Sequence, residues 1–199
     1  MTSRMRREPR QERSRRMVER IVAAGREVLV QRGYDAVTTN HIAAAAGISP
    51  GSLYQYFPDK SAVLAEVLDR YSQDVVARVS RAFLASVGAP TADGVRAVVT
   101  AMLDVYEEQP DLLRVLVEQV PRSAASTRAA FARRVDDMLT VAIGSRPDRD
   151  PGRPAVAVAW LLVRAVEHVT ISYVLERPPI DRDTVIDELT ALVATHLDR

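Results

Sequence analysis

The segment from Thr38 to Lys60 carries side chains that could bind nucleic acid. It reads TTNHIAAAAGISPGSLYQYFPDK and contains two stretches of helical pattern that meet at Gly47. In the second stretch the outward positions are small, polar or aromatic: Pro50, Gly51, Ser52, Tyr54, Gln55 and Tyr56. Such a surface suits the major groove of DNA, which is about 12 Å wide and displays the hydrogen-bonding edges of the bases. The pattern therefore predicts a DNA-reading helix.

Local signals define the two short helices that would present this surface. Thr38 is expected to cap the first helix and Ser49 the second, with Pro50 at a first helical position, where its missing N–H has no cost. Gly47 supplies the left-handed backbone conformation that the turn needs. Apolar side chains would pack against a preceding helix over residues 11–32: Ile42, Ile48, Leu53 and Phe57. These elements together predict a helix-turn-helix.

Charge separates the N-terminal part from the rest of the chain. The formal net charge of the 199 residues is +1, but residues 1–60 hold ten arginines, one lysine and six acidic residues. This leaves about +5 on residues 1–60 and −4 on residues 61–199, which predicts a DNA-binding domain followed by a separate second domain. Eight arginines between residues 4 and 20 form a basic arm. The arm either reaches DNA phosphates or the minor groove, or stays solvated without a specific contact.

Helical periodicity continues through the rest of the chain, without a strand pattern. Pro-, Gly- or polar-rich segments separate further helices expected over residues 60–86, 92–108, 111–120, 125–144 and 155–176. A last helix follows Asp181 or Asp183, either of which could cap it. The sequence thus predicts an all-α protein of about nine helices, with residues 1–60 as the helix-turn-helix domain and residues 61–199 as a second, helical domain.

The helix-turn-helix segment resembles the tetracycline repressor (TetR) family of transcriptional regulators, over roughly residues 14–65. The matching residues are Gly33, Tyr34, Thr38, Thr39, Ile42, Ala43, Ala46, Gly47, Ile48, Ser49, Gly51, Leu53, Tyr54, Tyr56, Phe57 and Lys60.

The resemblance implies two sets of DNA contacts. Phosphates would be held by Thr38, Thr39, Tyr54 and Lys60, with Ser49 acting first as a helix cap and second as a phosphate contact. Base edges would be faced by Asn40, Pro50, Gly51, Ser52, Gln55 and Tyr56. Many relatives carry a charged residue in place of Asn40 and a basic one in place of Pro50, so the operator sequence stays open.

The region after residue 60 has no catalytic or metal-binding pattern. The chain has no cysteine, and its three histidines, at 41, 168 and 196, are widely separated. Zinc sites of recognisable spacing are therefore not expected, and no HExxH, GxSxG, Walker or GxGxxG pattern occurs. We expect neither an enzyme nor a cofactor. A charged N-terminus and the absence of an uninterrupted apolar run of about 18 residues predict a cytoplasmic protein without a membrane span.

The helix expected over residues 155–176 is apolar nearly all round, so it needs cover on every side. The resemblance implies that this helix and the last one pair with those of a second copy in a homodimer. It also implies that residues 61–199 form a helical effector-binding and dimerisation domain, with the effector pocket among the helices expected over residues 60–176. Its candidate lining side chains are Met102, Tyr106, Gln119, Phe131, Met138, Trp160, Arg164, Glu167, His168 and Tyr173. The alternative for each of them is an ordinary core position without a ligand contact.

Two functions fit these expectations. The first is a repressor that binds a palindromic double-stranded DNA operator as a dimer and is released by a small-molecule effector. The second is a constitutive or architectural DNA-binding protein whose C-terminal domain only dimerises. A closed, fully packed C-terminal domain would favour the second function.

Overall fold

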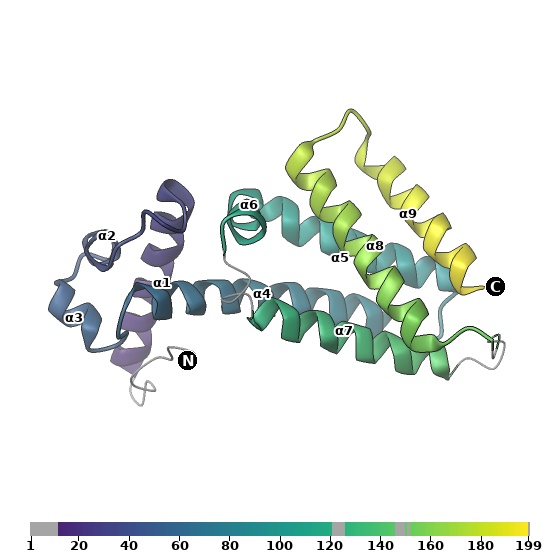
Figure 1. The fold of residues 1–199 in the computed structure, drawn as a ribbon, viewed down its shortest axis with the longest axis horizontal. Helices are drawn as coiled ribbons and strands as arrows, with labels where there is room; N and C mark the ends of the chain where they lie inside the picture. Colours follow the sequence, from purple (N-terminus) through teal and green to yellow (C-terminus); the bar gives the residue numbers. More distant parts are fainter. Residues whose placement is uncertain (1–11, 121–125, 146–149, 151, 199) are drawn as a thin grey trace. The chain divides into compact units, whose positions relative to one another are not determined.

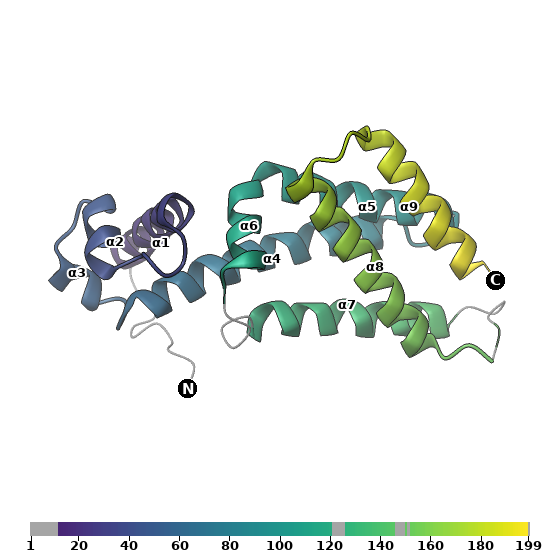
Figure 2. The same cartoon turned by 45° about the horizontal axis from the view of Figure 1, so that its top comes forward.

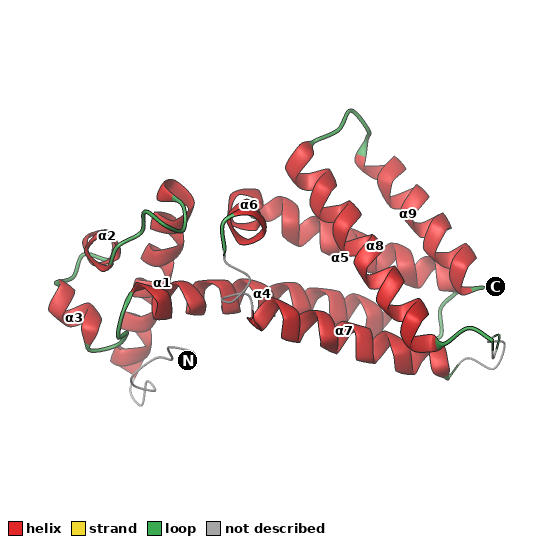
Figure 3. Ribbon diagram, viewed as in Figure 1, coloured by secondary structure: helices red, strands yellow, loops and turns green. Residues whose placement is uncertain are grey.

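A computed structural model describes residues 12–120, 126–145, 150 and 152–198, and within these ranges the side chains of residues 126–132 and 134 are not described. The described residues form nine helices and no strands (Figure 3). The helices are α1 (Glu12–Arg32), α2 (Thr39–Ala45), α3 (Pro50–Tyr54), α4 (Lys60–Ala85), α5 (Thr91–Glu108), α6 (Pro110–Glu118), α7 (Ser126–Gly144), α8 (Ala155–Glu176) and α9 (Arg182–Leu197). The all-α prediction is confirmed, and the ends of the helices expected over residues 11–32 and 60–176 lie within about two residues of those predicted.

The chain divides into two compact units. The first unit comprises residues 1–71 and 111–127, and the second comprises residues 72–110 and 128–199. The single helix α4 contributes to both units, whereas α6 belongs to the first. The predicted division into a DNA-binding part and an effector-binding part at residue 60 stays a prediction, because the two compact units are defined by packing and not by function.

The core of the first unit contains three of the four apolar side chains expected from the sequence, whereas the fourth, Ile48, is half-buried. Ile42, Leu53 and Phe57 are fully buried, and α1 presents a buried stripe that includes Ile21 and Leu29. Helices as short as α2 and α3 are not stable alone, so this packing holds them in place.

The C-terminal end of α6 is fastened to the turn that follows α1. Gln119 Oε1 accepts a hydrogen bond from the backbone N–H of Tyr34 at 3.0 Å. At Gly33, where φ is +78°, an added Cβ would lie 2.7 Å from that same oxygen. Burial raises the pKa of Tyr34, and the nearby Asp35 carboxylate raises it further, so the phenol stays neutral. The sequence placed Gln119 among the candidate pocket residues, but in the structure its amide supports the turn before α2.

The second unit is a helical bundle, and hydrogen bonds show which ends of its helices lie together. Thr91 Oγ1 at the start of α5 donates to Asp198 Oδ1 after the end of α9 at 3.0 Å. Arg153, just before α8, donates to the carbonyl oxygen of His196 at 3.0 Å. Helices α5 and α8 therefore start at the same end of the bundle, where α9 finishes. Figures 1 and 2 show α8 and α9 side by side, joined by the short segment of residues 177–181.

Helix α8 is the one described helix that is long and apolar enough to cross a membrane, by length and composition alone. In the structure Val158, Leu162 and Val166 are buried on one side of it. An ion pair joins its Arg164 to Asp136 of α7. These contacts are those of a helix in a protein bundle.

Candidate nucleic-acid interface and effector cavity

The two short helices begin at the caps that the sequence predicts. Thr38 Oγ1 accepts a hydrogen bond from the backbone N–H of His41 at 3.2 Å, and Ser49 Oγ accepts one from Ser52 at 3.1 Å. Pro50 is the first residue of α3, as expected. Each cap satisfies a backbone donor that the first turn of a helix leaves without an intrahelical partner. The start of α3 is thereby fixed relative to the turn.

The turn between α2 and α3 depends on Gly47. Its φ is +62°, a left-handed conformation that side chains with a Cβ rarely adopt. A Cβ added there would meet no atom within 4 Å. Space is therefore not the constraint, and the requirement for glycine comes from the backbone conformation.

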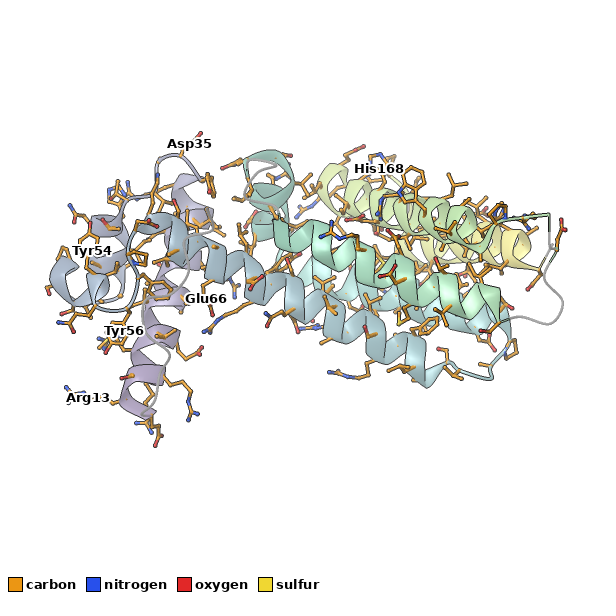
Figure 4. The ribbon with its side chains drawn as sticks, turned by 60° about the horizontal axis from the view of Figure 1, so that its bottom comes forward. Arg13, Asp35, Tyr54, Tyr56, Glu66 and His168 are labelled. Carbon is orange, nitrogen blue, oxygen red and sulfur yellow. The ribbon has the colours of Figure 1, made fainter. Side chains whose placement is uncertain are left out.

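The outer surface of α2 and α3 presents most of the predicted DNA-binding side chains. Tyr54 is 43% exposed although Leu53 and Phe57 beside it are fully buried, as the spacing predicts. Its hydroxyl lies 3.1 Å from Thr39 Oγ1, so a side chain of α2 and a side chain of α3 contact each other at this point. Figure 4 shows Tyr54 and Tyr56 in this unit. Exposed with Tyr54 are Thr38, Asn40, Ser49, Pro50, Gly51 and Gln55, while Thr39, Ser52 and Tyr56 are half-buried.

Lys60 has a structural role that its sequence position did not reveal. Its ammonium donates to the carbonyl oxygens of Val37 at 2.8 Å and Asp35 at 3.0 Å. A cation at the start of α4 opposes the helix dipole, and these two carbonyls compensate for it. Lys60 therefore fastens the segment that leads into the Thr38 cap, and one of its three N–H groups remains for another acceptor.

The basic arm lies only partly within the described residues. Arg4, Arg6, Arg7 and Arg10 fall outside them. The other four arginines of the arm are on α1: Arg13, Arg15, Arg16 and Arg20. Arg16 pairs with Glu12 one turn earlier on that helix.

The second unit contains an open cavity of about 490 Å³, within the range of roughly 300–1,000 Å³ usual for small-molecule sites. Apolar side chains of α4, α5, α7, α8 and α9 dominate its wall. Its lining includes Val79 and Phe83 of α4, Met102 and Tyr106 of α5, Met138 of α7 and Glu167 of α8. The residues that follow α4, from Ser86 to Thr91, complete the wall.

The structure brings four of the ten candidate pocket residues to this cavity: Met102, Tyr106, Met138 and Glu167. Tyr173 lines a smaller cavity of about 280 Å³ near the end of α8. Trp160 is 53% exposed, and His168 is exposed on the same helix (Figure 4). Phe131 lies outside the residues whose side chains are described.

Arg164 and its neighbours form a charged cluster beside the cavity. Its Nη2 donates to Asp136 Oδ2 at 2.8 Å, and its Nη1 lies 3.8 Å from Glu167 Oε2. The guanidinium also lies 5.8 Å from the centroid of the Trp160 ring, within the range of a cation–π contact. Arg164 thus contacts a carboxylate of α7 and an aromatic ring on its own helix.

Several lining residues were missed by sequence reasoning. They include Phe83, Val87, Val98 and Val163, all apolar positions on or next to helices. No signal in one sequence distinguishes such a residue from ordinary core, because both occupy the same helical periodicity.

Comparison with known proteins gives consistent matches over both parts of the chain. The family model described as bacterial regulatory proteins, tetR family, matches residues 21–67. The model described as tetracyclin repressor-like, C-terminal domain, matches residues 90–197. The HTH-type transcriptional activator FasR of Mycolicibacterium smegmatis is 30% identical over 174 residues, which cover 84% of this chain and 76% of FasR.

Other similar proteins share less sequence. The nucleoid occlusion factor SlmA of Haemophilus ducreyi is 29% identical over 86 residues, 43% of this chain and 42% of SlmA. The structure of FadR from Bacillus subtilis in complex with stearoyl-CoA superposes with a TM-score of 0.71 at 17% identity, covering 89% of this chain and 98% of FadR. The fatty acid degradation regulator FadR from Bacillus halodurans gives 0.71 at 14% identity, covering 89% and 94%. These structures share the fold.

The family models account for the helix-turn-helix and for the bundle that holds the cavity, and FasR is similar over most of both chains. The chain belongs to the TetR family of bacterial transcriptional regulators.

Proposed function

We propose that this protein is a homodimeric repressor of the cytoplasm that binds a palindromic operator and is released by a mostly apolar small molecule. One observation carries the proposal: a single chain holds both an exposed polar face on α2 and α3 and an open apolar cavity of about 490 Å³. In this proposal residues 1–60 bind DNA, and residues 61–199 bind the effector and dimerise.

The proposed DNA contacts follow from exposure and chemistry. Thr39 and Tyr54, whose hydroxyls lie 3.1 Å apart, would bind phosphate oxygens at the edge of the groove. Ser52 and Gln55 would face base edges from within it. Phosphate contacts position a protein on DNA, and base contacts specify the sequence. The remaining predicted contacts surround these four on the same helices or at their ends: Thr38, Asn40, Ser49, Pro50, Gly51, Tyr56 and Lys60.

The proposed dimer rests on an exposed apolar face of the second unit. Val156 is 64% exposed, Trp160 53% and Leu161 54% on α8, and Leu192 is 61% exposed on the adjacent α9. An apolar patch of this kind usually marks a protein contact. A second copy would cover it with the same residues in a two-fold arrangement. Sedimentation of the full chain should then give about twice the monomer mass of 22.0 kDa.

Helix α4 is the proposed link between effector and operator. It spans 26 residues, or about 39 Å at 1.5 Å per residue. It begins with Lys60 and carries the cavity residues Val79 and Phe83 near its other end. A ligand that shifts α4 would disturb the simultaneous docking of two recognition helices on half-sites about 34–36 Å apart. By linkage, DNA must weaken effector binding by the same factor.

A titration tests this proposal directly. An operator duplex is selected from random DNA, and a ligand is found by thermal-shift screening of the full chain. We expect saturation with the ligand to weaken operator binding by about 5–150-fold. Ala142→Trp is the matched control. Ala142 lines the cavity, so a tryptophan at this position occupies part of the cavity volume and should abolish the ligand response while operator binding persists.

The constitutive or architectural alternative has one supporting observation, the similarity to SlmA over 86 residues. Stoichiometric ligand binding without a change in operator affinity would favour it. The open cavity weighs against it, because a domain that only dimerises gains nothing from unfilled apolar volume. A reporter gene under the selected operator decides the sign of regulation, and we expect deletion of the regulator to raise expression.

A further inference from the structure

The outer surface of α2 and α3 has no cationic side chain of its own. Between Gly33 and Asp59 the sequence contains neither arginine nor lysine. Lys60 follows directly, but two of its three N–H groups donate to the carbonyl oxygens of Val37 and Asp35. One N–H group remains, whereas guanine presents two acceptors in the major groove, O6 and N7, to a bidentate cation. This segment therefore lacks the kind of side chain that most often reads guanine.

Two amide side chains on this surface have the chemistry that adenine requires. Asn40 of α2 and Gln55 at the end of α3 are exposed, and neither side chain has a hydrogen-bond partner among the residues that the structure describes. By contrast, the hydroxyl oxygens of Ser49 and Ser52 lie 2.9 Å apart and bond to each other. A carboxamide both donates and accepts, so it matches the N6 donor and N7 acceptor of adenine, whereas guanine presents two acceptors at the same edge.

The side chain of Gln55 lies on the side of α3 that faces away from the core. Its backbone is still helical, with φ −68° and ψ −26°. Leu53 is fully buried, and two residue steps along a helix rotate the side chain by about 200°. Gly51 lies one turn earlier on this outer side, where an added Cβ would meet only Ser49 Oγ, at 3.8 Å. A base can therefore approach Gln55 without a side chain at position 51 in its way.

A contact between the two helices places the second amide near the first. Thr39 Oγ1 of α2 lies 3.1 Å from the Tyr54 hydroxyl of α3. Asn40 and Gln55 are the next residues along the chain after these two, so both amides lie close to this contact. Pro50, exposed at the start of α3, adds an apolar surface of the kind that contacts the methyl group of thymine.

We infer that each operator half-site is read at A·T base pairs, with the amides of Gln55 and Asn40 hydrogen-bonded to the N6 and N7 atoms of adenine and with Pro50 against a thymine methyl group. The inference rests on the proposed DNA-binding function and specifies which bases are selected. Guanine has no bidentate partner on this surface.

An operator duplex selected from random DNA with the full chain tests the inference. Each base pair of the half-site is changed in turn, and binding is measured by fluorescence anisotropy for the natural sequence and for Gln55→Ala. The pair that Gln55 reads is the one whose change weakens binding of the natural sequence but not of the variant. We expect an A·T pair there, and its change to G·C should weaken binding about 5–150-fold. Asn40→Ala, measured in the same way, should identify a second A·T pair.

A base analogue separates hydrogen bonding from DNA shape. In 7-deazaadenine the N7 acceptor is replaced by C–H, while the Watson–Crick edge is kept. At the pair that Gln55 reads, this analogue should weaken binding of the natural sequence about 2–10-fold, the factor for one neutral hydrogen bond, and should leave binding of Gln55→Ala unchanged.

Two further variants control the measurement. Gln73→Ala is the matched control, because Gln73 is an exposed glutamine of α4 outside α2 and α3, and it should keep the cost of every base change. Gln55→Arg should move the preference at the identified pair from A·T to G·C, because its guanidinium supplies the two donors that guanine accepts.

Three results would overturn the inference. The first is a G·C pair identified by Gln55→Ala or Asn40→Ala, and the second is a Gln55→Ala profile that keeps the cost of every base change. The third is unchanged binding of the 7-deazaadenine duplex, since an A·T preference would then come from DNA shape. All three leave sequence-specific DNA binding intact. Failure to select any duplex counts against the proposed function and the inference together.

Discussion

Replacing Lys60 with methionine should loosen the segment that leads into α2. The substitution keeps an apolar stem but removes two hydrogen bonds, to the carbonyl oxygens of Val37 at 2.8 Å and Asp35 at 3.0 Å. A hydrogen bond to a charged group contributes about 1.5–3 kcal/mol, and the bond to Asp35 is exposed to competing water. We therefore expect a loss of about 2–4 kcal/mol in unfolding free energy. For a chain of 150–250 residues, this corresponds to a fall of roughly 5–15 °C in Tm.

Thermal and urea unfolding followed by circular dichroism measure this effect. Arg26→Met is the matched control, because it removes one exposed cation of the first unit and should change Tm by little. DNA binding at several salt concentrations tests the proposed phosphate contact of the third N–H, whose loss should lower the magnitude of the salt slope by about one. A Tm of Lys60→Met equal to that of Arg26→Met would refute the fastening role. An unchanged salt slope would refute the phosphate contact alone.

Four further perturbations have defined outcomes. Tyr54→Phe should weaken binding to operator and random duplexes by a similar factor of roughly five, measured by fluorescence anisotropy, and a loss confined to the operator would contradict a phosphate role. Gln119→Leu should destabilise the chain by about 1 kcal/mol in urea titrations, because the Tyr34 N–H loses its acceptor, and an unchanged urea midpoint would refute the support of this turn. Leu192→Arg should raise the dimer dissociation constant at least about 100-fold in sedimentation equilibrium, since it places a charge on the proposed apolar interface; a dimer of normal affinity would exclude α9 from it. The hydrogen bond from Arg78 lowers the pKa of Glu108 below its ordinary value of 4.5. The stabilisation that this pair gives to the folded state is therefore complete above pH 4.5 and is lost as the pH falls and Glu108 is protonated. Arg78→Gln removes this contribution, so the unfolding free energy of the variant should fall less between about pH 6 and pH 3 than that of the natural sequence.

The helix-turn-helix was readable from sequence because its determinants are local. Thr38 and Ser49 cap helices whose first donors are three residues away, and Gly47 meets a conformational need of its own backbone. The separation of Leu53 and Phe57 from Tyr54 follows from helical periodicity, so burial and exposure could be assigned residue by residue. The helix boundaries after residue 60 were predictable for the same reason.

Only the tertiary structure decided which distant residues meet. Gln119 lies 85 residues from Tyr34 and Lys60 lies 25 from Asp35, and no local pattern records either hydrogen bond. The cavity exists because the helices around it leave volume unfilled. A sequence does not show this volume, because cavity-lining residues and core residues recur with the same helical period. Residue types and spacing along one helix determine its faces, whereas the neighbours of each face depend on how several helices pack, and packing is a property of the whole chain.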